Sequence, residues 1–201
     1  MSGQKESVLS EITITMFKLV QEILEEEEKR DYFDLTEDAY LKKIELKTAA
    51  LSACSCKVGG ILSGVTEEGI VHLENYGKYL GIIYQINNDI LAFTNNTDKM
   101  DYSVENNQQQ DTLTLPLIHS LNQKIDMEVS DITLGPRAIT EIIQELNYCT
   151  VNDSSLEYAY SMMEHFALLA KEELDYFSKS STTKSLNYII DFLLNNIELN
   201  S

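Results

Sequence analysis

Residues 79–93 read YLGIIYQINNDILAF and carry polar side chains inside an otherwise apolar helical pattern. Gln85, Asn88 and Asp89 stand at i, i+3 and i+4, so a helix would stack them on one side, one turn apart. Two interpretations fit this spacing. The patch is either a ligand site in the core of a helical bundle, or the wet face or satisfied hydrogen-bond network of an ordinary long helix.

The helical spacing of apolar residues continues on both sides of this stretch through nearly the whole chain. Because only two prolines and eight glycines interrupt 201 residues, we expect an all-α bundle of about seven helices in one domain, residues 1–201. Thr36 is the expected N-cap of the second helix, and Gly64 is its expected stop. Residues 95–111 lack an apolar period and predict a flexible loop. The predicted helices are residues 12–30, 37–63, 66–91, 113–122 and 135–146, a long helix capped by Asn152 or Asp153, and residues 182–197.

Composition excludes several classes of protein and of partner. The chain has 33 acidic and 15 basic side chains, a formal charge of −18, while 43% of its residues are hydrophobic. This apolar content is enough for one sizeable core and argues against disorder. The negative charge disfavours nucleic acid and anionic lipid surfaces, so an anionic substrate would need a local basic pocket. With no apolar run long enough for a membrane span and no signal peptide in sight, we expect a cytoplasmic protein.

A second polar pattern lies earlier in the chain. Lys43 and Lys47 share a helix face at i, i+4, and Thr48 stands beside the second lysine. A carboxylate and amides on one helix that face a lysine on another form the kind of group that a bundle uses to hold a metal and its anionic ligand. The two patterns together indicate such a site, while spacing alone leaves the purely structural interpretation open.

Four short motifs follow one another along the chain. They are YLxxIxxKTAxL at residues 40–51, GG at 59–60, YGxxLGxxxQxxNDIL at 76–91 and TLPLI at 114–118. In this order and spacing they resemble the trans-isoprenyl diphosphate synthases, the polyprenyl synthetase family. The resemblance runs from about residue 31 through the C-terminal helices.

The resemblance implies a helical bundle of the isoprenoid synthase type, whose pocket holds Mg²⁺ between two aspartate-rich segments of the form Asp-Asp-x-x-Asp. Magnesium prefers carboxylate and phosphate oxygens, and it binds the diphosphate of an allylic substrate that isopentenyl diphosphate then attacks. By the same resemblance, Lys47, Thr48 and Gln85 bind the diphosphate, and Asp89 and Asn88 are the metal ligands. No catalytic residue is assigned, and the expected partners are prenyl diphosphate substrates.

This chain departs from the family pattern at the metal motif. Positions 88, 89 and 92 hold Asn88, Asp89 and Ala92, so one carboxylate of three remains, and no Asp-Asp dipeptide occurs in the sequence. The first aspartate-rich motif is missing, so we expect an N-terminally truncated bundle. The degraded second motif is similar to that of the prenyltransferases that modify tryptophan on bacterial quorum-sensing pheromones, which we take as the nearest branch.

Two hypotheses follow from this pattern. The first is a divergent prenyltransferase that acts on allylic diphosphates in isoprenoid biosynthesis and needs a second chain for the first aspartate-rich motif. The second is a non-catalytic helical interaction or regulatory subunit with a decayed metal site. Both predict a homo-oligomer or a heteromer, because part of a bundle leaves apolar helix faces that must be covered. The isolated chain is expected to be weak or inactive.

Overall fold

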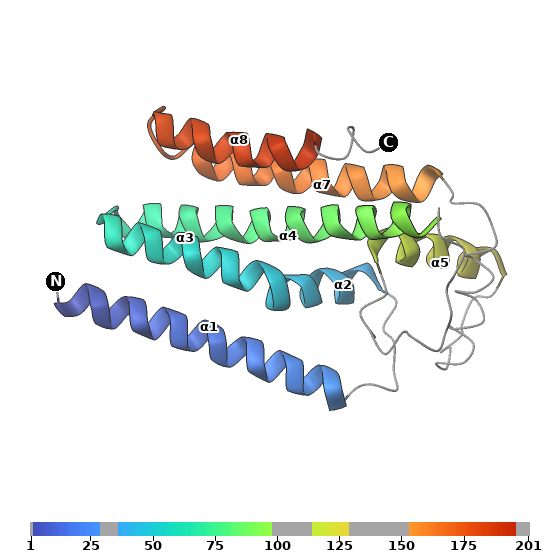
Figure 1. Ribbon diagram of the computed structural model, residues 1–201, viewed down its shortest axis with the longest axis horizontal. Coiled ribbons are helices and arrows are strands. Elements are labelled where there is room, and N and C mark those ends of the chain that lie inside the picture. Colours follow the sequence, from blue (N-terminus) through green and yellow to red (C-terminus); the bar gives the residue numbers. More distant parts are fainter. Residues whose placement is uncertain (1, 29–35, 98–113, 129–152, 196–201) are drawn as a thin grey trace.

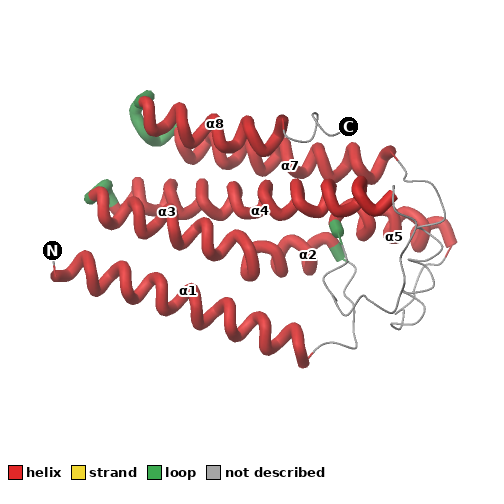
Figure 2. The backbone as a smooth tube through the Cα atoms, viewed as in Figure 1, coloured by secondary structure: helices red, strands yellow, loops and turns green. Residues whose placement is uncertain are grey.

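The computed structural model describes residues 2–28, 36–97, 114–128 and 153–195. Within these ranges the chain consists of helices and short connections, which confirms the predicted all-α class (Figure 2). None of the helices in the described ranges is long and apolar enough to cross a membrane. The helices are α1 (Ser2–Glu28), α2 (Glu37–Ile44), α3 (Ala50–Ser63), α4 (Glu67–Thr97), α5 (Leu115–Glu128), α7 (Asp153–Leu174) and α8 (Ser181–Asn195), and a π-helical turn, η1 (Glu45–Ala49), joins α2 to α3.

The two predicted helix boundaries that depend on capping are confirmed. The Thr36 hydroxyl accepts a hydrogen bond from the Ala39 N–H at 3.2 Å and so caps α2. Gly64 ends α3 in the left-handed region with φ of 72°, where its N–H bonds to carbonyl oxygens of the last turn. The predicted helix at 135–146 lies outside the described residues.

Three other helices are longer than predicted. α5 begins at Leu115 and continues to Glu128, past the predicted end at residue 122. α1 begins at Ser2, well before residue 12, so the mostly polar residues before Ile12 are helical as well. α4 continues to Thr97, past the predicted end at residue 91 and into the predicted loop at 95–111, the rest of which lies outside the described residues.

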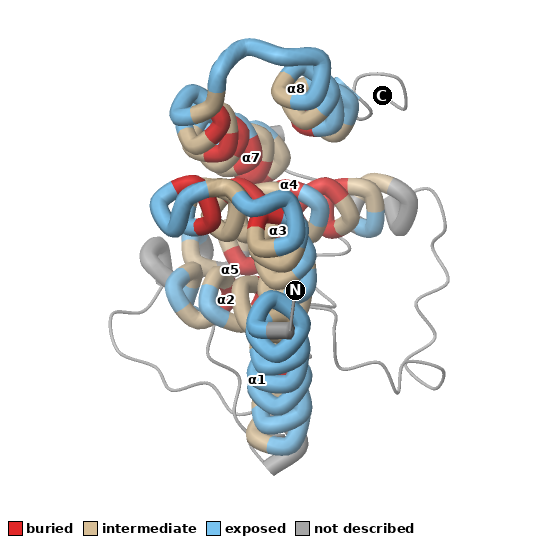
Figure 3. The backbone as a smooth tube through the Cα atoms, turned by 90° about the vertical axis from the view of Figure 1, so that its left-hand side faces the viewer, coloured by how far each residue is buried: buried red, intermediate tan, exposed pale blue. Residues whose placement is uncertain are grey.

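The core lies around α4, which packs on α3 on one side and on α7 on the other (Figure 1). This position explains why the apolar residues of α4 are buried more completely than those of the outer helices (Figure 3). The core side chains with essentially no exposed surface include Tyr76, Ile83, Ile86 and Ile90 of α4, Met163 of α7 and Ile190 of α8.

Two glycines set the distance between α4 and the α3 side of the bundle. A Cβ added at Gly81 would lie 2.5 Å from the Cα of Ala49, and Gly77 is equally close to the backbone of α3. Any side chain at either position would push the two helices apart. Gln85 and Asp89 continue the same stripe of α4 at steps of four residues, so the glycines bring this polar pair against α2 and η1.

α1 lies at the edge of the bundle, where it packs against α3 and η1. Leu19 is its buried apolar side chain among the described residues, at 8% exposure. Its other apolar side chains at helical spacing are exposed, from 42% at Ile12 to 60% at Leu24; they are Ile12, Met16, Val20, Ile23 and Leu24. Figure 3 shows this helix as mostly exposed along its length.

Candidate functional site

The site begins with the continuous helix that α2 and η1 form. Tyr40, Lys43 and Ile44 follow the Thr36 cap at helical spacing, and from Glu45 to Ala49 the helix widens into a π turn. A wider turn rotates the chain less per residue, which brings Thr48 nearer to the face that carries Tyr40. Single π turns within α-helices occur often at functional sites. The sequence predicted a regular helix here and gave no signal for the π turn.

Asp89 is the buried centre of the site, with 7% of its surface exposed. Its Oδ2 accepts a hydrogen bond from the Tyr40 hydroxyl at 2.7 Å and another from the Leu115 N–H at 3.3 Å. Its Oδ1 accepts a hydrogen bond from Gln85 Nε2 at 2.9 Å. A single carboxylate therefore connects α2, α4 and the first residue of α5, and both of its oxygens have protein donors.

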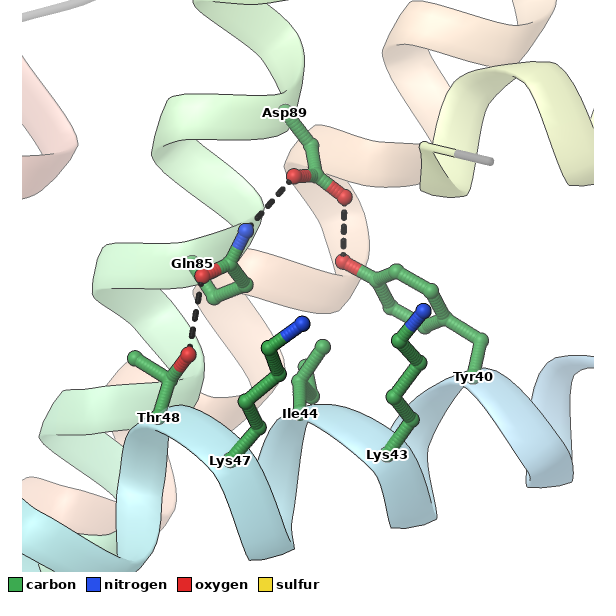
Figure 4. Close-up of a pocket in the computed structure, with 7 residues that line it drawn as sticks. All are labelled: Tyr40, Lys43, Ile44, Lys47, Thr48, Gln85 and Asp89. Carbon is green, nitrogen blue, oxygen red and sulfur yellow. Dashed lines mark hydrogen bonds between the residues drawn. The ribbon is translucent and has the colours of Figure 1, made fainter. Parts of the chain in front are cut away.

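Gln85 extends this network to η1. The Thr48 hydroxyl donates to Gln85 Oε1 at 3.0 Å, while the amide nitrogen of Gln85 donates to Asp89 (Figure 4). Because each end of the amide has a different partner, the orientation of the Gln85 side chain is fixed. The hydroxyl of Thr48 and the carboxylate of Asp89 are thereby held on opposite sides of one amide.

A pocket of about 120 Å³ lies between this network and the α2–η1 helix. Figure 4 shows Lys43 and Lys47 extending from α2 and η1 into the space in front of Gln85 and Asp89. Pockets that bury a drug-sized ligand measure about 300–1,000 Å³, so this one has the size for an ion or a head group. Its lining consists of Tyr40, Lys43, Ile44, Lys47, Thr48, Gln85 and Asp89.

Burial dominates the electrostatics of Asp89. It raises the pKa of this carboxyl above its usual range, although the hydrogen bonds from Tyr40, Gln85 and Leu115 and the charge of Lys43 act in the opposite direction. Burial also raises the pKa of Tyr40, and the neighbouring Asp89 raises it further, so Tyr40 is a neutral hydrogen-bond donor. The pocket lining has two ammonium groups and one carboxylate, an excess of positive charge in a chain whose formal charge is −18.

Four of the five predicted site residues line this pocket, namely Lys47, Thr48, Gln85 and Asp89. Asn88 does not line it and lies partly buried beside Asp89 on α4. The three other lining residues, Tyr40, Lys43 and Ile44, had no assigned role. The i, i+4 spacing of the lysines was the available signal for Lys43, whereas Tyr40 meets Asp89 across 49 residues of sequence, which no local pattern indicates.

These residues do not fit Mg²⁺ by themselves. Magnesium demands near-octahedral oxygen coordination, but the pocket offers one carboxylate whose oxygens already accept hydrogen bonds. The ammonium groups of Lys43 and Lys47 would also face the ion. Within the described ranges, no three His, Cys, Asp or Glu side chains are grouped closely enough to hold a metal. Binding of Mg²⁺ would therefore need further carboxylates.

The sequence of this chain is similar to those of isoprenyl diphosphate synthases. A sequence model of the polyprenyl synthetase family matches residues 4–146, so the match begins in α1, earlier than the predicted start at about residue 31. The short chain isoprenyl diphosphate synthase of Methanothermobacter thermautotrophicus is 27% identical over 162 residues, which are 80% of this chain and 50% of that protein. Heptaprenyl diphosphate synthase component 2 of Bacillus subtilis is 27% identical over 172 residues, 83% of this chain and 48% of that protein. The chain spans about half the length of the curated relatives it matches.

Solved structures show the same arrangement of helices. Geranylgeranyl pyrophosphate synthase from Lactobacillus brevis superposes with a TM-score of 0.74 at 23% identity, covering 94% of this chain and 61% of that one. Decaprenyl diphosphate synthase from Rhodobacter capsulatus gives a TM-score of 0.69 at 22% identity, covering 98% and 62%. At these identities the likeness shows the fold, an all-α bundle of the isoprenoid synthase type. The pheromone-modifying branch stays a prediction.

Proposed function

Because this chain belongs to the polyprenyl synthetase family, we propose that it is a prenyltransferase subunit that binds the diphosphate of an allylic substrate in the pocket between α2, η1 and α4. One observation carries the proposal. Lys43 and Lys47 from one helix meet Gln85 from another around a pocket of head-group size, in a chain that is otherwise strongly acidic. A diphosphate needs such a local basic site if it is to approach a protein of this charge.

Each lining residue has a distinct part in this proposal. The ammonium group of Lys47, and that of Lys43 beside it, attract and hold the negative diphosphate as compact point charges. Thr48 and Gln85 offer polar atoms whose positions their mutual hydrogen bond fixes. Asp89 positions Gln85 and Tyr40 by accepting a hydrogen bond from each. Prenyl transfer releases the diphosphate, and in this proposal the pocket stabilises the negative charge on the departing group.

The resemblance to the family implies Mg²⁺ at the diphosphate, with Asp89 and Asn88 as the ligands from this chain. We propose that the further carboxylates come from an aspartate-rich segment of a second chain, because the pocket supplies a single carboxylate. The name of the Bacillus subtilis relative, component 2 of a heptaprenyl diphosphate synthase, supports this because it indicates a synthase with more than one component. In this proposal the working protein is a homo-oligomer or a heteromer in the cytoplasm.

A non-catalytic, regulatory subunit is the second candidate function. The observation that favours it is the state of Asp89, whose two oxygens both accept hydrogen bonds from this chain's own groups. Together with Asn88 and Ala92 at the other motif positions, this arrangement leaves a scaffold in which the carboxylate holds helices together. Such a subunit would stabilise a catalytic partner without binding substrate.

The test is an elongation assay with Mg²⁺, farnesyl diphosphate and isopentenyl diphosphate. The chain is assayed alone and with a second chain that carries Asp-Asp-x-x-Asp, and longer prenyl diphosphates are measured. We expect elongation with the second chain and little or none without it. Lys47→Ala should abolish most of the activity, whereas Lys42→Ala, an exposed lysine on the same helix that does not line the pocket, should keep it. Full activity of Lys47→Ala in the assembled enzyme would favour the regulatory function.

A further inference from the structure

We infer that in the chain by itself, before a second chain supplies further carboxylates, this pocket takes the diphosphate group as the free anion. Under that condition Mg²⁺ competes with the pocket for the diphosphate instead of bridging the two. The inference rests on the proposed function, because it concerns how the same pocket recognises a diphosphate. It departs from what the family resemblance implies for the metal, and it gives Lys43 a specific part.

The charges around the pocket favour an anion over a divalent cation. Lys43 and Lys47 contribute two ammonium groups, and Asp89 contributes the one carboxylate of the lining. A magnesium ion entering this space would meet two like charges and one opposite charge. A diphosphate would meet the reverse, and the low exposure of the surrounding groups strengthens both effects.

The state of Asp89 points in the same direction. Both of its oxygens accept hydrogen bonds, from the Tyr40 hydroxyl and the Leu115 N–H on one side and from Gln85 on the other. The carboxylate is also buried, with 7% of its surface exposed. These three donors take up three of the about four lone-pair sites of the carboxylate, so Asp89 has little left to offer a metal. An anion held by the lysines leaves the network unchanged.

Lys43 and Lys47 are placed so that both can contact one diphosphate. Lys43 stands one turn before Lys47, lines the same pocket, and its charge acts on Asp89. Lys47 lies within the π turn beside Thr48, at the other end of the lining segment. Figure 4 shows both side chains extending toward the same space. Two ammonium groups on one helix face can thus hold two phosphoryl groups of one diphosphate.

Metal complexation should weaken this binding for a simple electrostatic reason. A magnesium ion bound to a diphosphate neutralises two of its negative charges, and those are the charges that the two lysines attract. The complex also brings hydrating waters that the pocket, with its oxygens already bonded, cannot replace. Affinity should therefore be highest in a chelator and should fall as Mg²⁺ is added.

The experiment titrates inorganic pyrophosphate and, separately, farnesyl diphosphate into the full 201-residue chain by calorimetry, first in EDTA and then in excess Mg²⁺. We expect both ligands to bind in EDTA and to bind about tenfold or more weakly with Mg²⁺. Lys43→Gln and Lys47→Gln should each weaken binding in EDTA by about tenfold, the loss of one charge-assisted contact. Lys42→Gln makes the same change of charge at an exposed neighbouring site and should have less than about a twofold effect. Thermal melts monitored by circular dichroism verify that each variant is folded.

The outcomes separate this inference from the proposed function. Binding of both ligands that appears only with Mg²⁺ overturns the inference and leaves the proposed function standing. Binding of pyrophosphate but not of farnesyl diphosphate in EDTA supports the metal-free pocket and contradicts the prenyl substrate. An equal loss of affinity in Lys42→Gln and Lys43→Gln contradicts the assignment of the pocket, and no binding under any condition contradicts both proposals.

Discussion

Two parts of one stripe of α4 meet the neighbouring helix in opposite ways. At Gly77 and Gly81 the backbones of α4 and the α3 side approach so closely that there is no room for a side chain. At Gln85 and Asp89, further along the same stripe, polar side chains fill the space and a pocket remains beside them. The difference shows that the glycines do not form the site but hold the helices at the separation at which the Tyr40 hydroxyl reaches Asp89.

The largest expected effect comes from adding a side chain at one of the two glycines. Gly81→Leu places a side chain where a Cβ would already lie 2.5 Å from the Cα of Ala49, so the helices must separate. We expect a loss of about 3 kcal/mol in the free energy of unfolding, the upper range for overpacking. Urea denaturation measures it.

Gly59→Ala is the matched control for this prediction. Gly59 lies inside α3, and a Cβ there would meet nothing within 4 Å. The substitution should stabilise the protein by about 0.5–1 kcal/mol, because alanine is the better helix former. Equal effects of the two substitutions would show that the glycine contact does not hold α4 in place.

The next effect comes from the polar end of the stripe. Tyr40→Phe removes the donor at 2.7 Å from Asp89 Oδ2 and leaves a buried carboxylate with fewer partners. We expect a loss of about 2 kcal/mol. Tyr84→Phe, at an exposed position of α4, should change stability by less than about 0.5 kcal/mol. If Tyr40→Phe were as mild as its control, the carboxylate would not be what joins α2 to α4.

The pH dependence of stability tests whether burial or hydrogen bonding controls Asp89. Burial raises its pKa, so the folded protein keeps this proton at pH values where the unfolded chain, with a carboxyl pKa of about 3.9, has lost it. The stability that protonated Asp89 contributes is fully present below about pH 3.9 and is lost as the pH rises through the raised folded pKa. The unfolding free energy of the wild type minus that of Asp89→Asn should therefore fall from about pH 4 toward neutrality. A difference that rises with pH would mean that the hydrogen bonds outweigh burial.

The smallest effect is expected where the network is more exposed. Thr48→Val removes the hydrogen bond to Gln85 Oε1 and keeps the shape of the side chain. We expect a loss of about 1 kcal/mol, which urea denaturation can resolve. Ser55→Ala, which removes a hydroxyl from an exposed position of α3, should be close to neutral. A loss with Thr48→Val larger than that with Tyr40→Phe would reverse the order that burial predicts.

Most of the fold could be predicted because it depends on local signals. The caps at Thr36 and Gly64 and the start of α7 at Asp153 follow from residues next to each boundary. The start of α1 could not be predicted from apolar periodicity, because its first turns are polar and carry no stripe. The π turn η1 leaves no pattern in the sequence either, because the register of a helix changes there without a change in composition.

The sequence indicated most of the polar residues of the site but not the contacts between them. Spacing brought Gln85 and Asp89 to one face and Lys43 and Lys47 to another, and the structure places all four around one pocket. Asn88 neighbours Asp89 in sequence but does not line the pocket, because adjacent residues of a helix point in different directions. The partners of Asp89 depend on long-range packing: Tyr40 is 49 residues away and the Leu115 N–H is 26 residues away.

We propose above all that the pocket between α2, η1 and α4 binds the diphosphate of a prenyl substrate. A crystal structure of the full chain soaked with farnesyl diphosphate tests it most directly. We predict diphosphate oxygens within hydrogen-bond distance of both Lys43 Nζ and Lys47 Nζ, with the Tyr40–Asp89 hydrogen bond retained. A diphosphate bound elsewhere, with neither lysine in contact with it, would contradict the account.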